Sequence, residues 1–151
     1  MRRKDREITD RAEIDAVLGE ATVCRIGLVD GGVPYVIPVS YGYEDGSVYF
    51  HSAPEGKKIT LLEKNPRCCF EVDICDGIIR GERPCSWGMR YRSVIGYGMA
   101  EILKGPEEKR QGLNCIVNHY GGGTFEFSEQ DLGPVTVIRI AVESMTGKKH
   151  D

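Results

Sequence analysis

The feature that most constrains the fold is a series of three β-rich runs in the first third of the chain. They cover residues 22–29, 33–43 and 47–52. Asp30-Gly31-Gly32 and Asp45-Gly46, which separate them, are typical of tight hairpin turns. Strands joined by such short turns pair antiparallel. The sequence therefore predicts an antiparallel sheet rather than a parallel one.

The rest of the chain adds three strands and three helices to this pattern. The further strands are expected at 67–74, about 89–103 and 134–146, and the helices after Asp10, at about 56–64 and from Pro106. Residues 75–88 are polar and contain Gly and Pro, which predicts a loop. Six strands with only three helices do not suit a doubly wound βαβ sheet, so we expect a mainly β (α+β) fold, an antiparallel barrel with peripheral helices. Side chains fill the interior of a small barrel, so a ligand should lie on its outer surface or between subunits.

Composition narrows the class of protein and of partner. The 151 residues suit a single domain, 1–151, with its own core. A formal net charge of -3 disfavours general nucleic-acid binding. No apolar run reaches the roughly 20 residues of a membrane span, and the charged N-terminus MRRKDREITD lacks the apolar stretch of a signal peptide. We therefore expect a cytoplasmic protein with no membrane partner.

The six cysteines show no metal-binding pattern, because no CxxC pair occurs and the three histidines are scattered. Cys68 and Cys69 are neighbours in a predicted strand and should point to opposite faces. Most of the cysteines are expected to be reduced apolar fillers. A Cys75–Cys85 link and an iron–sulfur site are the alternatives, and no metal site is predicted.

The segment HSAPEGKK, residues 51–58, places a histidine at a strand end and two lysines at a helix start. A helix N-terminus already carries partial positive charge, so Lys57 and Lys58 are unfavourable there unless an anion is present. Backbone N–H groups and ammonium groups together suit a phosphate, and Ser52 and Ser40 could add hydroxyl donors. Solvated surface lysines and a structural His51 are the alternatives. His51 could also act as a donor, base or ligand near neutral pH.

Other candidates lie on the predicted strands. Pro34 and Pro38 within one strand indicate an edge, a bulge or an interrupted ladder, where a ligand could use free backbone groups. Arg90 and Arg92 share one face of the long strand and could bind an anion, an acidic chain or a row of surface carboxylates. Trp87 could cover a flat ring, or anchor the core or an interface.

Four segments of the chain, taken together, carry a family resemblance. They are MRRKDREITD, PYVIPVSYGYEDGSVYFHSAPEGKKITLLEKNPRCCFEVD, CSWGMRYRSVIGYGMAEI and VIRIAVESMTGKK. The sequence closely resembles the 5-nitroimidazole-resistance (Nim) branch of the pyridoxamine 5′-phosphate oxidase-like, FMN-binding split-barrel proteins over nearly its whole length. This resemblance implies a six-stranded antiparallel split β-barrel that binds FMN at the interface of a homodimer.

The resemblance assigns roles around HSAPEGKK. Lys57 and Lys58 would hold the flavin phosphate at the junction of strand and helix. His51 and Ser52 would line the cofactor or its tail, and His51 also matches the histidine that this branch places near flavin and substrate. Trp87 would lie near the ring, from the same or the other subunit.

Two strands complete the cofactor site that the resemblance implies. Pro38, Val39 and Ser40 would run beside the isoalloxazine and ribityl groups. Arg92 and Ser93 match positions near the ribityl and phosphate.

The implied activity is that of a flavin-dependent oxidoreductase acting on a nitroimidazole or another small molecule. FMN would carry the redox chemistry, His51 could donate a proton, and NAD(P)H or a protein would reduce the flavin. The substrate motif of a true pyridoxamine-phosphate oxidase is missing, so that activity is not expected. The alternatives are a non-catalytic flavin-binding or sensing dimer, and a split-barrel protein that uses haem or a deazaflavin.

Overall fold

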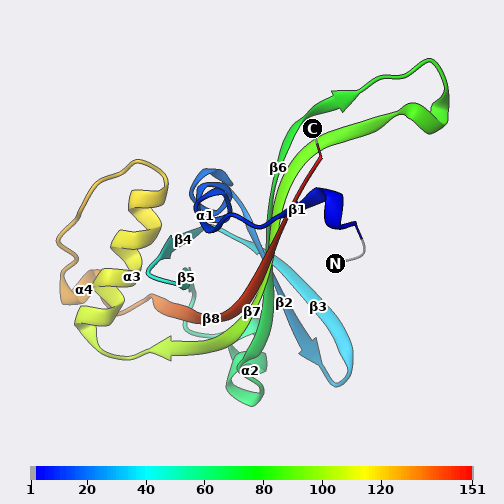
Figure 1. Ribbon diagram of the computed structural model, residues 1–151. Coiled ribbons are helices and arrows are strands. Elements are labelled where there is room, and N and C mark those ends of the chain that lie inside the picture. The colour runs from blue at the N-terminus through cyan, green and yellow to red at the C-terminus, as the bar shows by residue number, and fades with distance from the viewer. Residues whose placement is uncertain (1–2, 151) are drawn as a thin grey trace.

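The computed structural model describes residues 3–150 and has eight strands and four α-helices among them (Figure 1). The strands are β1 Glu7–Ile8, β2 Cys24–Asp30, β3 Val33–Val39, β4 Tyr41–Glu44, β5 Ser47–Ser52, β6 Arg67–Ile79, β7 Gly88–Leu103 and β8 Thr136–His150. The helices are α1 Arg11–Glu20, α2 Lys57–Lys64, α3 Pro106–His119 and α4 Glu129–Leu132, with 3-10 turns at Lys4–Arg6 and Pro84–Ser86. The ends of the predicted domain, residues 1–2 and 151, lie outside the described residues.

The strands form one antiparallel sheet in the order β3-β2-β6-β7-β8-β5-β4, and β1 pairs with β8. This confirms the predicted mainly β, antiparallel fold. The predicted count of six strands is too low, because the run 33–43 breaks at Ser40 into β3 and β4 and because β1 is additional. β3 pairs only with β2 and β4 only with β5, so the two halves of that run lie at opposite ends of the strand order.

Large side chains fill the interior of the barrel that the sheet forms, as predicted for a small barrel. Tyr41, Phe50, Phe70, Ile26 and Ile138 are each fully buried in the main cluster. A second cluster lies beneath α3 and includes Tyr49, Leu113, Ile116 and Val137. A ligand must therefore bind outside the barrel.

The first helix begins as its sequence indicates. The carboxylate of Asp10 accepts a hydrogen bond from the Ala12 N–H at 3.0 Å, which is an N-cap. Glu13 stands at the reciprocal capping-box position, but its carboxylate instead accepts from Lys149 Nζ at 2.6 Å. Ile14, Val17 and Leu18 form the buried stripe.

The predicted loop at 75–88 is too long: residues 75–79 and 88 belong to β6 and β7, and residues 80–87 form the loop and 3-10 turn at the tip of a projecting β-hairpin. β6 continues to Ile79 and pairs with the start of β7, with a bulge between Cys75 and Gly77. Gly77 has a φ of 131°, which favours glycine. We call residues 77–90 the arm; it extends away from the body at the upper right of Figure 1. Its sequence reads as a loop because no core covers either of its faces.

The arm also excludes the Cys75–Cys85 link. Cys75 pairs with Tyr91 at the root of the arm, whereas Cys85 lies beyond the last strand pair, Ile79 with Gly88. Four residues of extended strand separate the two by roughly 13 Å, more than a disulfide spans. All six cysteines are free. Burial raises the pKa of the Cys24, Cys68 and Cys115 thiols to about 12, as expected of apolar fillers.

Two further observations bear on the sequence patterns. The two glycines in the long strand 89–103, Gly96 and Gly98, suggest from sequence a bend or the close approach of another group. The group that approaches is the protein's own: a Cβ would lie 2.2 Å from the Phe70 ring at Gly96 and 2.3 Å from the Ala141 carbonyl oxygen at Gly98. None of the helices between residues 3 and 150 combines the length and hydropathy that a bilayer-spanning helix needs.

Candidate functional site

The N-terminus of α2 is open to an anion. Gly56 is the N-cap residue, with a φ of 135°, and no side chain caps the helix. The first turn has no acidic residue and instead contains Lys57 and Lys58. The first amide N–H groups of a helix have no partner within it and favour negative charge. The expected helix at 56–64 is thus confirmed, and its start combines free N–H groups with two ammonium groups.

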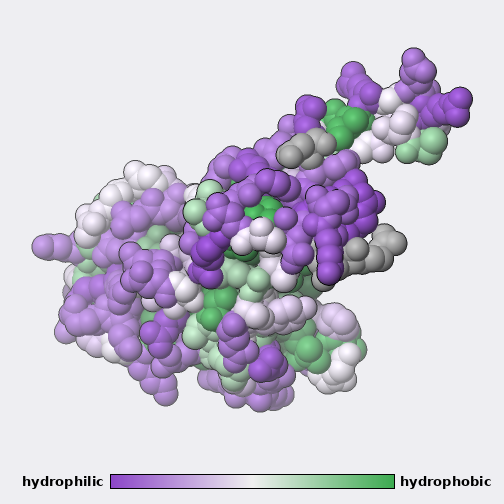
Figure 2. All heavy atoms as spheres, viewed as in Figure 1, coloured by the Kyte–Doolittle hydropathy of each residue, from purple (hydrophilic) through white to green (hydrophobic). Residues whose placement is uncertain are grey.

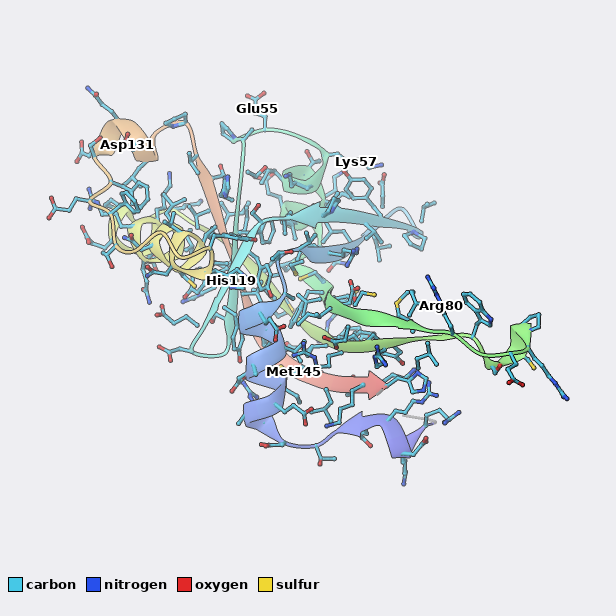
Figure 3. The ribbon with its side chains drawn as sticks, turned by 90° about the horizontal axis from the view of Figure 1, so that it is seen from above. Glu55, Lys57, Arg80, His119, Asp131 and Met145 are labelled. Atoms are coloured by element: carbon cyan, nitrogen blue, oxygen red, sulfur yellow. The ribbon has the colours of Figure 1, made fainter. Side chains whose placement is uncertain are left out.

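Lys57 lies beside the β2–β3 hairpin (Figure 3). Its Nζ is 2.9 Å from a carboxylate oxygen of Asp30, at the end of β2, and 4.7 Å from the centroid of the Tyr35 ring on β3. The pair raises the pKa of Lys57 and lowers that of Asp30. Both side chains are about half exposed, so the ion pair is weak and can rearrange. Lys58 is half-buried and forms no ion pair with any residue from 3 to 150.

Ser52 contributes a buried hydroxyl without a partner. The residue is 7% exposed, and its Oγ makes no hydrogen bond to any residue from 3 to 150. Leaving a buried hydroxyl unsatisfied costs about 1–3 kcal/mol. Ser52 ends β5, and residues 53–56 alone separate it from α2. The unpaired donor therefore lies four residues before the open helix N-terminus in the chain.

His51 points to the other side of β5. Side chains alternate along a strand, so Ser52 shares the core side with Phe50, while His51 shares the other side with Tyr49. His51 is exposed, pairs in register with Val137 and makes no side-chain hydrogen bond within residues 3–150. The two neighbours therefore do not line one surface within this chain.

The predicted cofactor strand is β3, at the edge of the sheet as its prolines indicated. Pro38 and Ser40 are exposed on the side away from the core. The side chain of Val39 is half-buried and packs against the main core cluster. Val39 can therefore meet a ligand only through its backbone.

Arg92 and Ser93, adjacent on β7, also face opposite ways. Ser93 pairs with Asp73 on the side away from the core, the side of Pro38. Arg92 instead donates to two carboxylates: Nε and Nη2 contact Asp76 at 2.9 and 2.8 Å, and Nη1 and Nη2 contact Glu20 at 2.7 and 2.9 Å. These contacts raise the pKa of Arg92 and lower those of Glu20 and Asp76. Of the partners considered for Arg92 from the sequence, surface carboxylates of its own chain are the ones that it binds in this structure.

A cavity of about 410 Å³ lies on the same outer face, which we define as the side of β3, β2, β6 and β7 turned away from the main core. Its lining is mainly apolar and includes Gly27, Val29, Pro34, Val36 and Tyr97. Of these residues, the sequence pattern indicated only Pro34 as a candidate. The sequence pattern that could have predicted this cavity is the presence of apolar residues on both faces of β2 and β3, which is typical of strands covered on both sides.

Trp87 lies far from the other candidates within the chain. It precedes β7 on the arm and is 54% exposed. Figure 1 shows the arm and α2 at different ends of the molecule. The structure thus places Lys57 and Lys58 at the start of α2 and Ser52 at the end of the preceding strand, β5. Pro38, Ser40 and Ser93 lie on the outer face, while Arg92 and Trp87 belong to the arm and its root.

Comparisons with known proteins agree with this architecture. The pyridoxamine 5′-phosphate oxidase family profile matches residues 10–149. A candidate 5-nitroimidazole antibiotic resistance protein from Bacteroides thetaiotaomicron has 35% sequence identity and a TM-score of 0.84, with 95% of this chain and 86% of that chain covered. No match was found among the curated proteins.

Two solved structures add flavoproteins to the set. An FAD-binding protein from Mesorhizobium loti is 27% identical, with a TM-score of 0.71 and 97% of this chain and 98% of that chain covered. A flavocytochrome from Azotobacter vinelandii is 21% identical, with a TM-score of 0.87 and 100% of this chain and 72% of that chain covered, and shows the shared fold alone. The match over residues 10–149 and the 35% identity show that this chain belongs to the pyridoxamine 5′-phosphate oxidase-like family.

Proposed function

We propose that the protein is an FMN-dependent oxidoreductase that reduces small molecules such as nitroimidazoles, with the flavin at the interface of a homodimer. The observation that carries this proposal is the start of α2. There an uncapped helix N-terminus and two lysines follow, within a few residues of the chain, a strand end that carries an unpaired buried hydroxyl. This donor set suits a phosphate dianion.

The phosphate would rest against the first-turn N–H groups of α2, with Lys57 and Lys58 as counter-charges and Ser52 as a hydroxyl donor. Lys57 would share its charge between the phosphate and Asp30. Arg92 would reach a phosphate only by giving up contacts to Glu20 or Asp76, so its contribution should be smaller than that of the lysines.

The flavin ring would lie over β3 and the outer face. Pro38, the Val39 backbone and Ser40 offer an edge for the ring and ribityl groups, and Ser93 offers a hydroxyl from β7. Several large apolar side chains of this face are exposed, namely Val29, Val36, Ile95 and Tyr97. Such a patch on a small protein favours an interface. We propose that a second copy covers it, and that Trp87 can approach the ring only from that copy.

FMN would supply the redox chemistry when bound. Reducing a nitro group to a nitroso group and water consumes two electrons and two protons. NAD(P)H or a reduced protein would provide the electrons. His51 is exposed and free of hydrogen bonds within residues 3–150, so it can turn toward a bound substrate and donate one of the protons.

Cofactor binding tests the proposal directly. The purified protein should show flavin absorbance, and its cofactor-free form should take up one FMN per chain. The same titration with FAD, haem and a deazaflavin separates FMN from the cofactors of related proteins. A colourless protein that takes up no FMN would refute the proposed function.

Turnover separates the enzyme from a flavin-binding or sensing dimer. We expect NAD(P)H oxidation that depends on a nitro compound or a quinone. His51→Gln should lower kcat by about 10²-fold with the Kd for FMN unchanged. Stoichiometric flavin binding with no turnover of any electron donor and acceptor would favour the non-catalytic function. That function also agrees with His51, whose side chain no hydrogen bond within residues 3–150 orients.

A further inference from the structure

The arm, residues 77–90, is a β-hairpin that the described chain leaves largely uncovered, with His150 of β8 in contact with its base, where Nδ1 lies 3.0 Å from the Met89 carbonyl oxygen. It stands clear of every helix in Figure 1. Three large apolar residues on it are exposed: Ile78 at 51%, Trp87 at 54% and Met89 at 45%. An isolated two-stranded hairpin is only marginally stable in water. A paired hairpin that exposes these side chains is better explained by a surface that covers it.

The apolar side of the arm continues the outer face. Ile78 and Met89 are cross-strand partners. Met89 shares its side of β7 with Ile95 and Tyr97, because side chains alternate along the strand. A partner that covers the outer face would therefore meet the arm as well.

The root of the arm is fixed. At the bulge, Asp76 turns its carboxylate to Arg92, which also binds Glu20 of α1. Two bidentate contacts thus tie β6 and β7 to α1 at the point where the hairpin leaves the body. The arm is held outward in a defined direction.

The charge of the arm is opposite to that of the rest of the chain. It has three arginines, Arg80, Arg83 and Arg90, and one acidic residue, Glu82, in a chain whose formal net charge is -3. Arg80 and Arg83 form no ion pair with residues 3–150, and Figure 3 shows Arg80 at the far end of the molecule from Asp131. Figure 2 shows the hydrophilic, purple surface of the body, with apolar, green spheres at the arm and the β2–β3 hairpin.

We propose that the arm is a clasp that lies against the body of a second copy of this chain and buries Trp87 there. A basic arm complements an acidic body, and a two-fold dimer makes this contact twice, each arm on the other body. The copy is the same one that the outer face would bind. The inference rests on the homodimer of the proposed function but not on flavin binding or catalysis.

Trp87 is the only tryptophan in the chain, so its fluorescence reports on the arm alone. The experiment uses cofactor-free full-length protein, with the mass of the species followed by sedimentation across a dilution series. In the dimer, we expect blue-shifted emission and acrylamide quenching at least about twofold weaker than in the monomer. Where no monomer forms on dilution, N-acetyltryptophanamide serves as the exposed reference.

Charge reversal on the arm provides the second readout. Arg80→Glu with Arg83→Glu should raise the Kd of the dimer at least about 10-fold, because two charges are reversed on each of two arms that face an acidic body. Lys64→Glu with Lys104→Glu, an equal change of charge away from the arm, should alter it less than about threefold. Equal effects of the two double variants would contradict the clasp.

Each remaining outcome decides a separate point. A dimer in which Trp87 stays as exposed as the reference overturns the clasp and leaves the proposed function intact. A protein that is monomeric at every concentration overturns both the clasp and the proposed homodimer. A dimer that buries Trp87 but takes up no FMN supports the clasp and refutes only the flavoprotein proposal.

Discussion

The start of α2 and the root of the arm both present cationic side chains that the sequence offers as anion-binding groups, but their surroundings differ. At α2, Lys57 has one half-exposed partner, Lys58 has no ion pair within residues 3–150, and the helix has no cap. At the arm, the guanidinium of Arg92 makes four hydrogen bonds to Glu20 and Asp76.

The difference teaches that unsatisfied donors, rather than positive charge, mark an anion site. Arg92 is saturated by its own chain and fixes a hairpin. The α2 site combines spare N–H groups, ammonium groups and the Ser52 hydroxyl. Four changes test this contrast, beginning with the one of largest expected effect.

Removing both lysines should affect the flavin most. Lys57→Ala with Lys58→Ala should weaken FMN binding about 100-fold, because each charge-assisted contact to a phosphate is worth about 1.5–3 kcal/mol before solvent screening. Isothermal titration measures the change. Lys64→Ala, at the other end of the same helix, is the matched control and should leave the Kd within about twofold.

Ser52→Ala should weaken FMN binding by up to about 10-fold, the usual value of one hydrogen bond. The same change should not lower the melting temperature of the cofactor-free protein, since the hydroxyl has no partner there to lose. Thermal denaturation with and without FMN measures both. A clear loss of stability without FMN would show that Ser52 is a structural residue.

Arg92→Ala should act mainly on stability and much less on the cofactor than the lysine variant does. We expect a fall in melting temperature of roughly 2–4 °C at pH 7, given that all three partners are partly exposed. Arg92 lowers the folded pKa of Glu20 and Asp76, so this stabilisation is complete above their ordinary pKa values and is lost as pH falls through the lowered ones. The gap between variant and wild type should therefore narrow below about pH 4.5. A loss of FMN affinity comparable to that of the lysine variant would reverse the contrast.

The smallest expected effect is a gain. Asp30→Asn removes the partner of Lys57 and frees its ammonium group for the phosphate. FMN affinity should rise about two- to threefold, as expected for an exposed ion pair. The control compares Lys57→Ala with the double variant Asp30→Asn, Lys57→Ala. Equal FMN affinities of these two proteins would show that Asp30 acts through Lys57. A higher affinity of the double variant would contradict this explanation.

The sequence predicted those features that depend on neighbouring residues. Tight turns at Asp30-Gly31-Gly32 and Asp45-Gly46 predicted the hairpins, and Gly56 with Lys57 predicted the start of α2; all are confirmed. The split of 33–43 at Ser40 depends on which distant strand each half pairs with. That pairing is not encoded in the local pattern, so one strand was expected where two form.

The features that the sequence did not predict depend on distant partners. Arg92 is 72 residues from Glu20, and no spacing rule links them. The pairing of β6 with β7 carries the ladder past a bulge into residues that read as a loop. Strand alternation requires His51 and Ser52 to point in opposite directions, but this was not part of the prediction. The resemblance placed both residues along the cofactor without considering it.

A comparison of FMN with riboflavin, which lacks only the phosphate, tests the central claim most directly. Both affinities are measured for the wild type and for Lys57→Ala with Lys58→Ala. We predict that the wild type prefers FMN by about 100-fold or more, that the lysine variant loses most of this preference, and that riboflavin binds the two proteins equally well. A preference for FMN that survives in the lysine variant would contradict a phosphate site at the start of α2.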